Sequence, residues 1–461
     1  MNICQFGKWA FFLMNDGLNI NPAQIIDMKR ITLIVHMFMP ESSSGTEVLT
    51  YNIAKSLQKK GYEVSIISAY QNNGIEEGSL HEEVYDNLSV YKISYQKTLL
   101  TDVISRDLHS IKVSDSLKNL LHLLKPDIIQ FTHLKYVSAQ AIDIALQQSS
   151  RVFLFSTDYW FACPKTTLFN SNTKFICDNK SITVSDCVSC MINVNLVSIC
   201  ANTIGKFGWL FPSFPFDLHI TLEKRTTEII KAYNKLSGIF APSQFMENKL
   251  IEAGVDRKLI SVIPFAQDVS ISTDFRNNND VNKTEEVTVA FIGTIIPEKG
   301  AHVYIDVVKQ LYKENIKIRF KLYGDLKNKT KYVEKILRAS KHLPNLEICG
   351  TFKQENFEDV LKLIDIVIVP SIWHENSPLV AVKSALAGKW LIMSDVGGLR
   401  TIMDYSDKTE YFETGNALDC SLKLSQLIKD WHIRKLKVNT KNISEFSDEI
   451  MTKSIISKYM Q

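Results

Sequence analysis

The segment WHENSPLVAVKSALAG, at residues 373–388, contains residue types that can hold a diphosphate and a sugar. Ser377 is typical of a helix N-cap, Pro378 of the first helical position and Gly388 of a helix end. The N-terminus of such a helix offers free backbone N–H groups and a partial positive charge to an anion. Glu375, just before the helix, could accept hydrogen bonds from sugar hydroxyls. A capped, buried helix with an incidental surface carboxylate explains the pattern equally well.

A cysteine cluster is the second candidate site. Five of the eight cysteines fall within residues 163–200, and Cys163, Cys177, Cys187 and Cys190 bracket a polar insertion that ends in a C-x-x-C pair. Tetrahedral zinc binds four thiolates, and a loop with few apolar residues needs a cross-link, so the pattern predicts a structural zinc ion. The alternative is four reduced thiols, because a second C-x-x-C pair is missing. We assign these cysteines no catalytic role.

The stretch FGWLFPSFPF, at residues 207–216, gathers aromatic side chains around two prolines. Such side chains could touch a lipid-linked molecule at a membrane surface. Packing in a core or between domains is the alternative.

Size and composition describe a folded, globular chain. The 461 residues are enough for roughly two to three domains. A formal charge of +3 is too small for a dedicated nucleic-acid surface, so we expect no nucleic-acid partner. No apolar run approaches the roughly 18 residues of a membrane span. The first residues have too short an apolar core for a secretory signal, so we expect a cytoplasmic protein.

The elements that must position these residues alternate between strands and helices. The run ITLIVHMF from Ile31 predicts a strand; Leu49, Ile53 and Leu57 predict a helix, and GYEVSIIS predicts the next strand. Further elements are expected as a helix near 111–124, a strand at 126–131, a helix near 136–147 and a strand at 152–156. The pattern is that of a Rossmann-like domain.

A second set of strands follows a polar, Asn-rich segment at 274–286. Ser243 and Gly254 bound a helix before it, and VTVAFIG, IKIRFKLYG, NLEICG, DIVIVP and KWLIMSD are the strands after it. The predicted fold class is α/β, with two Rossmann-like doubly wound domains that face a cleft. We divide the chain into an extension or upstream start (1–27), a first domain (28–273) with the Cys-rich insertion (163–200), a linker (274–286), a second domain (287–440) and a C-terminal helix (441–461) that could pack back on the first domain.

The segment at 373–388 resembles the donor-binding segment of the group 1 glycosyltransferases, family 4, which have the GT-B fold. The family motif is an acidic residue, seven residues and a second acidic residue. Glu375 matches the first position, which in the family holds the donor sugar. Lys383 replaces the second carboxylate, which usually binds the ribose; it could meet a phosphate instead, or be a solvated helix lysine. The resemblance implies donor contacts for Asn376, Ser377, Pro378, Leu379, Val380 and Lys383.

The loop FIGTIIPEKG, at residues 291–300, is similar to the diphosphate-binding loop of the same family. Gly293 and Thr294 stand at the end of the strand, with Thr294 where an arginine is frequent. Lys299 matches the lysine that neutralises the leaving diphosphate. Since a lysine and a helix N-terminus can replace a metal ion, the resemblance implies no cofactor for catalysis. A lysine in such a turn is otherwise commonplace.

Glycines at other strand ends complete the expected donor site. Gly324, Gly397 and Gly398 would let a ligand approach the backbone, although turn formation alone explains them as well. Where the family commonly has a glutamate three positions after the paired glycines, this chain has Thr401.

Two loops of the first domain resemble those of the family. Gly45 and Thr46, after the first strand, would approach the donor phosphate and the acceptor. FSTDYWFACP resembles a subgroup with an aspartate before an aromatic pair; many relatives have a histidine at Thr157. Asp158 is the acidic candidate nearest the reacting carbon.

The resemblance covers roughly residues 29–455. It implies a retaining transferase that moves a hexose or related sugar from a nucleotide-sugar donor, held by the second domain, to a glycan or lipid-linked glycan held by the first. Lipopolysaccharide, capsule or exopolysaccharide would be the product, with contact at the inner face of the membrane. Lys299, Glu375 and Asp158 are the expected catalytic residues.

Two other functions fit the same scaffold. The departures at Thr294, Lys383 and Thr401 would suit a catalytically degenerate nucleotide-sugar-binding protein. A sugar-nucleotide epimerase shares the architecture, but nothing in WHENSPLV supports it.

Overall fold

The computed structural model describes most of the chain as two α/β domains. The described residues are 30–96, 100–170, 172–173, 175–177, 183–191, 214–266, 286–328, 330–353, 356–376, 378–435, 437 and 447–461. The expected extension at 1–27, nearly all of the expected linker, Ser377 and most of the aromatic stretch at 207–216 lie outside these ranges.

An eight-stranded sheet forms the first domain, in the order β10-β9-β6-β5-β1-β2-β4-β3. All neighbouring strands are parallel except β3 and β4, which form an antiparallel edge. The strands are β1 (Arg30–Val35), β2 (Glu63–Gln71), β3 (Leu80–Tyr85), β4 (Leu88–Tyr95), β5 (Ile128–Phe131), β6 (Val152–Phe155), β9 (Gly238–Ala241) and β10 (Ile260–Val262). The helices are α3 (Gly45–Lys59), α4 (Leu100–Leu108), α5 (Ile111–Leu124), α6 (Gln140–Gln148), α9 (Phe214–Tyr233) and α10 (Gln244–Ala253).

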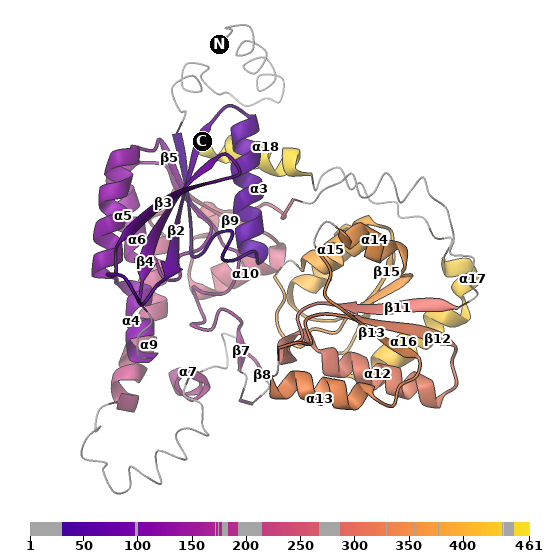
Figure 1. The fold of residues 1–461 in the computed structure, drawn as a ribbon. Helices are drawn as coiled ribbons and strands as arrows, with labels where there is room; N and C mark the ends of the chain where they lie inside the picture. The colour runs from indigo at the N-terminus through magenta and orange to yellow at the C-terminus, as the bar shows by residue number, and fades with distance from the viewer. Residues whose placement is uncertain are drawn as a thin grey trace, which may run out of the picture.

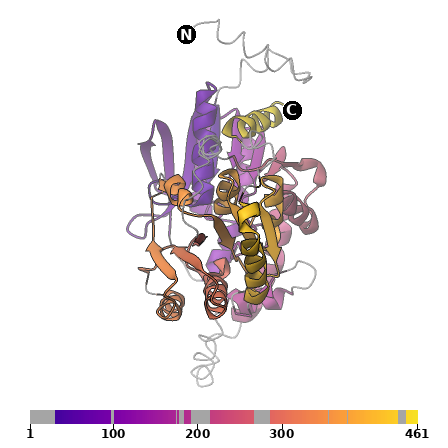
Figure 2. The ribbon, with the colours of Figure 1, turned by 90° about the vertical axis from the view of Figure 1, so that its right-hand side faces the viewer.

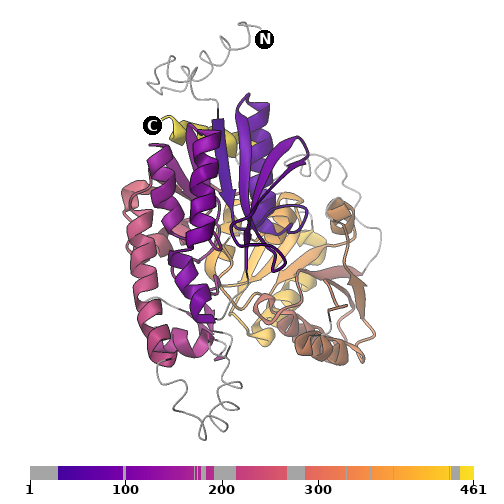
Figure 3. The ribbon, with the colours of Figure 1, turned by 60° about the vertical axis from the view of Figure 1, so that its left-hand side comes forward.

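Both faces of this sheet are buried, which is why its central strands are mostly apolar. Helices α5, α6 and α9 cover one face, and α3 covers the other (Figures 1 and 3). In α3 the predicted period is confirmed, because Leu49, Ile53 and Leu57 are all buried. In α10 the Ser243 side chain accepts the Met246 N–H, and Gly254 ends the helix with a φ of 104°. The predicted caps of α10 are thus confirmed.

A six-stranded parallel sheet forms the second domain, in the order β13-β12-β11-β14-β15-β16. Its strands are β11 (Val287–Ile292), β12 (Ile318–Tyr323), β13 (Leu346–Gly350), β14 (Ile366–Val369), β15 (Trp390–Ser394) and β16 (Thr409–Phe412). Its helices are α12 (Ala301–Lys313), α13 (Lys331–Ser340), α14 (Phe357–Lys362), α15 (Leu379–Leu386), α16 (Ala417–Lys429) and α17 (Trp431–Arg434). Apolar clusters on both faces of the sheet form its core. The predicted α/β fold class is confirmed.

The last helix, α18 (Asp448–Tyr459), belongs to the first domain although it follows the second in the sequence. It lies beside α3 (Figure 1), and Figure 2 shows it from the side, apart from the other C-terminal helices. Met451, Ile455 and Tyr459 are buried in the same cluster as the α3 side chains. The Tyr459 hydroxyl donates to Gln130 Oε1 over 2.6 Å, and Arg151 Nη1 donates to the Tyr459 carbonyl over 2.6 Å.

A small insertion projects from the first domain between β6 and α9. It consists of the two-residue strands β7 (Phe169–Asn170) and β8 (Phe175–Ile176) and the helix α7 (Val184–Met191). No residue of α7 is fully buried.

Candidate functional site

Glu375 is the centre of the candidate site and follows β14 by six residues. Its side chain is almost fully buried, with 4% of the residue exposed. Three donors bind Oε1: Lys299 Nζ at 2.7 Å, the Ser371 hydroxyl at 2.6 Å and Trp373 Nε1 at 2.9 Å. No described residue donates to Oε2. One carboxylate oxygen is thus fixed by three side chains of the protein.

The charge of Glu375 is stabilised by these donors. Burial by itself raises the pKa of the Glu375 carboxyl, but Lys299, Ser371 and Trp373 outweigh it and hold the pKa below its usual value. The carboxylate is therefore ionised and paired with a cation inside the protein. Such a buried, hydrogen-bonded charge pair is typical of a functional site.

The loop after β11 brings Lys299 to Glu375 across the sheet. Pro297–Lys299 form one turn of 3-10 helix, and Gly300 follows with a φ of 72°. A Cβ on Gly300 would lie 1.8 Å from the Pro370 carbonyl oxygen, so only glycine allows this approach. The Ile372 N–H also donates to the Glu298 carbonyl over 2.8 Å. The two loops predicted to carry donor chemistry are therefore packed together.

The paired glycines 397 and 398 accommodate protein backbone. A Cβ on Gly398 would lie 1.9 Å from the Asn376 carbonyl oxygen, and one on Gly397 would lie 2.8 Å from that of Glu375. The Gly398 N–H donates to the Glu375 carbonyl over 2.6 Å. The sequence left close ligand approach and turn formation open, and the contacts show a further reason for these glycines, the packing of their backbone against that of the Glu375 loop. Thr401 donates to the Gly398 carbonyl and closes the same turn.

Gly324 and Gly293 end the neighbouring strands β12 and β11. A Cβ on Gly324 would lie 2.4 Å from the Gly293 carbonyl oxygen. Thr294, the next residue, is exposed.

Helix α15 begins one residue later than the sequence predicts. Pro378 is the N-cap and Leu379 the first helical residue, so the prediction of Pro378 at the first helical position was wrong. The ψ of 107° at Pro378 keeps that residue extended, which delays the helix. Val380 packs against the core of the second domain. Lys383 Nζ lies 5.2 Å from the centre of the Phe357 ring of α14, a cation–π contact within the domain.

Thr157 of the first domain contacts the loop that precedes α15 in the second domain, and Thr46 contacts Thr157. Asn376 Nδ2 donates to the Thr157 carbonyl over 2.8 Å, and Thr46 Oγ1 donates to Thr157 Oγ1 over 3.1 Å. A Cβ on Gly45 would lie only 3.8 Å from Leu379 Cδ1. Gly45 and Thr46, predicted from one domain, thus lie opposite Asn376 and Leu379, predicted from the other.

Asp158 belongs to a cluster of titratable side chains that the sequence did not predict. His133 Nε2 lies 2.8 Å from Asp158 Oδ2, and the His36 and His133 rings are 4.4 Å apart. His36 Nε2 is 3.4 Å from Glu47 Oε1. His36 directly follows β1 and His133 lies two residues after β5, both at carboxyl ends of central strands, and that position was the available signal.

The pKa values of His36 and Asp158 are both lowered, which leaves the histidine neutral and the carboxylate charged. Burial, followed by the neighbouring His133, holds the pKa of His36 well below its usual value, so His36 is neutral. Burial acts to raise the pKa of Asp158, but the charge and hydrogen bond of His133 lower it overall. Asp158 is therefore an ionised carboxylate.

A buried ion pair supports the Asp158 loop from behind. The Trp160 N–H donates to Asp158 Oδ1 over 2.8 Å, and Trp160 Nε1 donates to Asp107 Oδ1 over 3.1 Å. Arg225 Nε donates to Asp107 Oδ2 over 2.7 Å, and its Nη2 donates to the Trp160 carbonyl over 2.7 Å. The Tyr159 hydroxyl donates to the Glu375 carbonyl over 3.4 Å and links the Asp158 loop to the loop that carries Glu375.

The four cysteines of the insertion lie apart from this cluster and line one cavity. All four are free thiols and half-buried. Burial and the neighbouring thiols raise the pKa of Cys177 to about 12 and that of Cys187 to about 11. Among the described residues, no three His, Cys, Asp or Glu side chains are already placed as metal ligands.

Comparison with known proteins relates the second domain to a family of glycosyltransferases. Residues 272–444 match the family Glycosyl transferases group 1. Sucrose-phosphate synthase from Thermosynechococcus elongatus has the same two-domain fold, with a TM-score of 0.64 and 13% identity over 94% of this chain and 98% of that one. The second domain is thus similar to the group 1 glycosyltransferases, and the chain as a whole has the GT-B fold.

Individual proteins related to this chain have low sequence identity to it. An uncharacterized 42.6 kDa protein in the cps region of Klebsiella pneumoniae is 23% identical over 80% of this chain and 86% of its own length. A lipopolysaccharide 1,2-N-acetylglucosaminetransferase of Salmonella typhimurium is 29% identical, over 35% of this chain and 45% of that enzyme. HepE of Anabaena, solved in complex with UDP-glucose, has a TM-score of 0.59 and 14% identity over 93% of this chain and 98% of that one. None of the described helices is long and apolar enough to cross a membrane.

Proposed function

We propose that this enzyme transfers a hexose or related sugar, with retention of configuration, from a nucleotide-sugar donor to a hydroxyl of a growing surface glycan. The observation that carries the proposal is the buried pair of Lys299 and Glu375, which lies where the two domains meet. The complex of HepE with UDP-glucose supports the donor class. The relatives from a cps region and from lipopolysaccharide synthesis support lipopolysaccharide, capsule or exopolysaccharide as the product.

The donor diphosphate binds between Lys299 and the start of α15 at Pro378. In the reaction the bond between the anomeric carbon and the diphosphate breaks, and a bond to the acceptor oxygen forms. The departing diphosphate takes the proton of the acceptor hydroxyl, so no protein nucleophile is needed. Lys299 and the backbone N–H groups of α15 stabilise the negative charge on the leaving group without a metal ion.

Glu375 orients the sugar through Oε2. In the structure Lys299 Nζ pairs with Glu375 Oε1. When the donor binds, the Lys299 ammonium contacts both this carboxylate oxygen and a phosphate oxygen of the donor. Asn376, Leu379, Gly45 and Thr46 bound the donor from both domains.

The acceptor binds on the side of the first domain. The carboxylate of Asp158, which contacts His133, binds an acceptor hydroxyl near the reacting carbon. A lipid-linked glycan is included among the acceptors. Its expected aromatic contact at 207–216 lies largely outside the described residues.

A nucleotide-sugar-binding protein without catalysis is the second candidate. Thr294 is exposed and uncharged, Lys383 packs on Phe357, and Thr401 binds Gly398. Thr294 and Thr401 therefore supply no charge, and the Lys383 ammonium contacts the Phe357 ring.

A donor panel separates these functions. Purified enzyme is incubated with UDP-, GDP-, ADP- and dTDP-sugars, with and without cell-derived acceptors, while calorimetry measures binding and a coupled assay measures nucleotide release. We expect one donor to bind and to be consumed faster with acceptor. Binding without turnover supports the binding protein, and the absence of both contradicts the proposal.

The variant Glu375→Ala tests the named residue. Turnover should fall at least about tenfold, since the sugar loses its orienting group. Glu334→Ala, an exposed glutamate on α13 of the same domain, is the matched control and should keep wild-type turnover. Near-native activity of Glu375→Ala would refute the assignment.

A further inference from the structure

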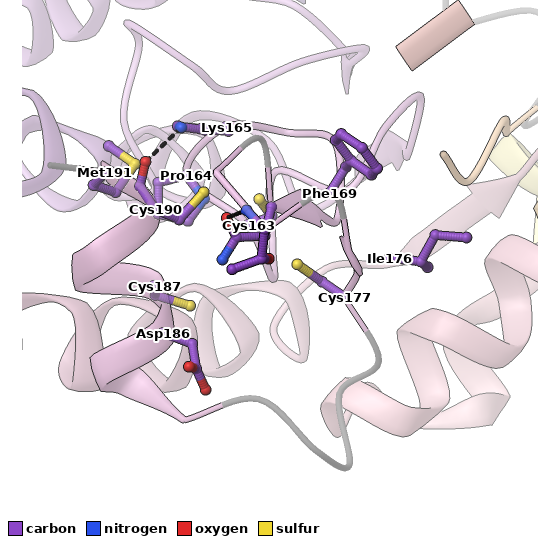
Figure 4. A pocket seen from close by; sticks show the side chains of 12 residues that line it. Cys163, Pro164, Lys165, Phe169, Ile176, Cys177, Asp186, Cys187, Cys190 and Met191 are labelled. Atoms are coloured by element: carbon purple, nitrogen blue, oxygen red, sulfur yellow. Dashed lines mark hydrogen bonds between the residues drawn. The ribbon is translucent and has the colours of Figure 1, made fainter. Parts of the chain in front are cut away.

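The insertion of the first domain brings four cysteines from three segments to one cavity of about 310 Å³. Cys163 follows the Asp158 loop, Cys177 follows β8, and Cys187 and Cys190 lie on α7. A spacing of three residues puts the last two on one face of the helix. Figure 4 shows the four side chains around the cavity, with Cys177 and Cys187 on opposite sides.

The donor set suits one metal in particular. Four thiolates in tetrahedral geometry are a structural zinc site, and each sulfur binds the ion at about 2.3 Å. The surrounding elements need such a cross-link because β7 and β8 have two residues each and no residue of α7 is fully buried. The described thiols are not yet at ligand distances, so binding requires α7 and the hairpin to close around the cavity.

A buried cation points independently to negative charge at the cysteines. Arg225 is fully buried, yet its Nη1 has no hydrogen-bond partner among the described residues. Arg225 lines a second cavity, of about 330 Å³, together with Cys163, Cys177 and Cys187. A buried guanidinium with an unused N–H is costly unless an acceptor meets it. Four thiolates around a divalent cation carry a net charge of −2 and supply that acceptor.

A second cation, Lys165, contacts the C-terminal end of α7. Lys165 Nζ donates to the Cys190 carbonyl over 2.6 Å and lines the first cavity. A second positive charge therefore lies at the edge of the cavity that the four cysteines line.

We propose that Cys163, Cys177, Cys187 and Cys190 bind one structural zinc ion, and that Arg225 Nη1 donates to a metal-bound thiolate. The four thiols release their protons to solvent on binding, and no oxidation occurs. Arg225 also holds Asp107 and Trp160, so the zinc site is joined through three contacts to the loop that carries Asp158. The ion would fix the insertion and, through Arg225, the acceptor side of the cleft.

Metal analysis of the purified full chain tests the site. Plasma mass spectrometry should find about one zinc per chain, and the double variant C187S/C190S should lose it. The control C349S removes a free cysteine of the second domain and should retain zinc. Less than about 0.1 zinc per chain in the wild type, or disulfides among the four cysteines by intact mass, would overturn the proposal.

A second measurement covers the case in which the double variant does not fold. The wild-type chain is stripped with a chelator and given Co²⁺ alone. Thiolate-to-cobalt charge-transfer absorption together with tetrahedral ligand-field bands is the expected result, and zinc should abolish both. A spectrum of octahedral cobalt without thiolate bands overturns the proposal, whatever the activity of the enzyme.

Discussion

At the scale of single residues, the candidate site depends on how the buried carboxylate of Glu375 is kept charged. Glu375 is nearly inaccessible to water, and its Oε1 accepts from three side chains of the two donor loops. A carboxylate in that position would be unfavourable if these donors were not preorganised. The same preorganisation suits a group that must orient a sugar while a negatively charged leaving group departs nearby.

Replacement of Lys299 tests the pair. In Lys299→Ala the Ser371 and Trp373 donors remain, so we expect a loss of roughly 1–3 kcal/mol in the free energy of unfolding. The pKa of Glu375 should rise, because burial stays and the cation is gone. Turnover should fall by about tenfold or more, measured at saturating donor. Lys335→Ala, on the exposed side of α13, is the control; equal turnover in both variants would contradict the role of Lys299.

His36 should make stability depend on pH. Its pKa is lowered in the folded protein, so below about pH 6.5 the unfolded chain takes up a proton that the folded chain refuses. Stability is therefore complete above that pH and is lost as the pH falls through it, by up to about 1.4 kcal/mol per pH unit. Thermal unfolding at pH 7.5 and 5.5 measures the loss.

The variant His36→Gln should show a smaller loss between the same two pH values. His81→Gln, on the edge strand β3, should behave like the wild type. An identical pH dependence in His36→Gln and the wild type would exclude His36 as the cause.

At the scale of elements, the sequence predicts the buried strands well because their apolar runs are continuous. The strands around Ile31 and Val152 appear where expected. The hairpin of β3 and β4 is absent from the prediction, since β3 reads LHEEVY and lies at the solvated edge of the sheet. The start of α15 was misplaced because Pro378 suits both the N-cap and the first helical position.

The candidate site was predictable only as separate loops. The sequence indicates that Lys299 and Glu375 follow strands, but it does not show that their side chains meet across 76 residues. His133 and His36 were missed for the same reason, because strand order in the sheet, and not sequence spacing, brings them together. The close approach of Gly398 to Asn376 is likewise a property of packed loops.

A substitution at Gly398 tests the packing of its loop against the loop at Asn376. In Gly398→Ala the new Cβ meets the Asn376 carbonyl, so the donor loop must move, at a cost of about 1–3 kcal/mol in unfolding free energy. The Michaelis constant for the donor should rise with it. Gly74→Ala, in an exposed loop of the first domain, should change neither quantity. Unchanged donor kinetics in Gly398→Ala would show that the loop position does not matter.

At the scale of the whole molecule, two connections join the domains. The hydrogen bonds of Asn376 to Thr157 and of Tyr159 to Glu375 cross the cleft directly. The chain also returns after the second domain, so that α18 completes the core of the first. The loop that carries Glu375 is thus bound to the first domain at the candidate site, and α18 adds a second connection through the α3 cluster.

Removal of residues 447–461 tests the second connection. The deletion would expose the apolar surface of α3 and leave Gln130 without the Tyr459 hydroxyl. We expect a lower midpoint of thermal unfolding and more aggregation, with the donor affinity of the remaining folded protein preserved. Calorimetry and light scattering check both, and an unchanged midpoint would contradict the structural role of α18.

The stereochemistry of transfer tests the central claim most directly. Once the donor panel has identified a donor, proton NMR of the fresh product reports the configuration at its anomeric carbon. Because the acceptor attacks from the face that the diphosphate leaves, the product should have the same anomeric configuration as the donor. Inversion at that carbon would contradict the mechanism proposed for Lys299 and Glu375.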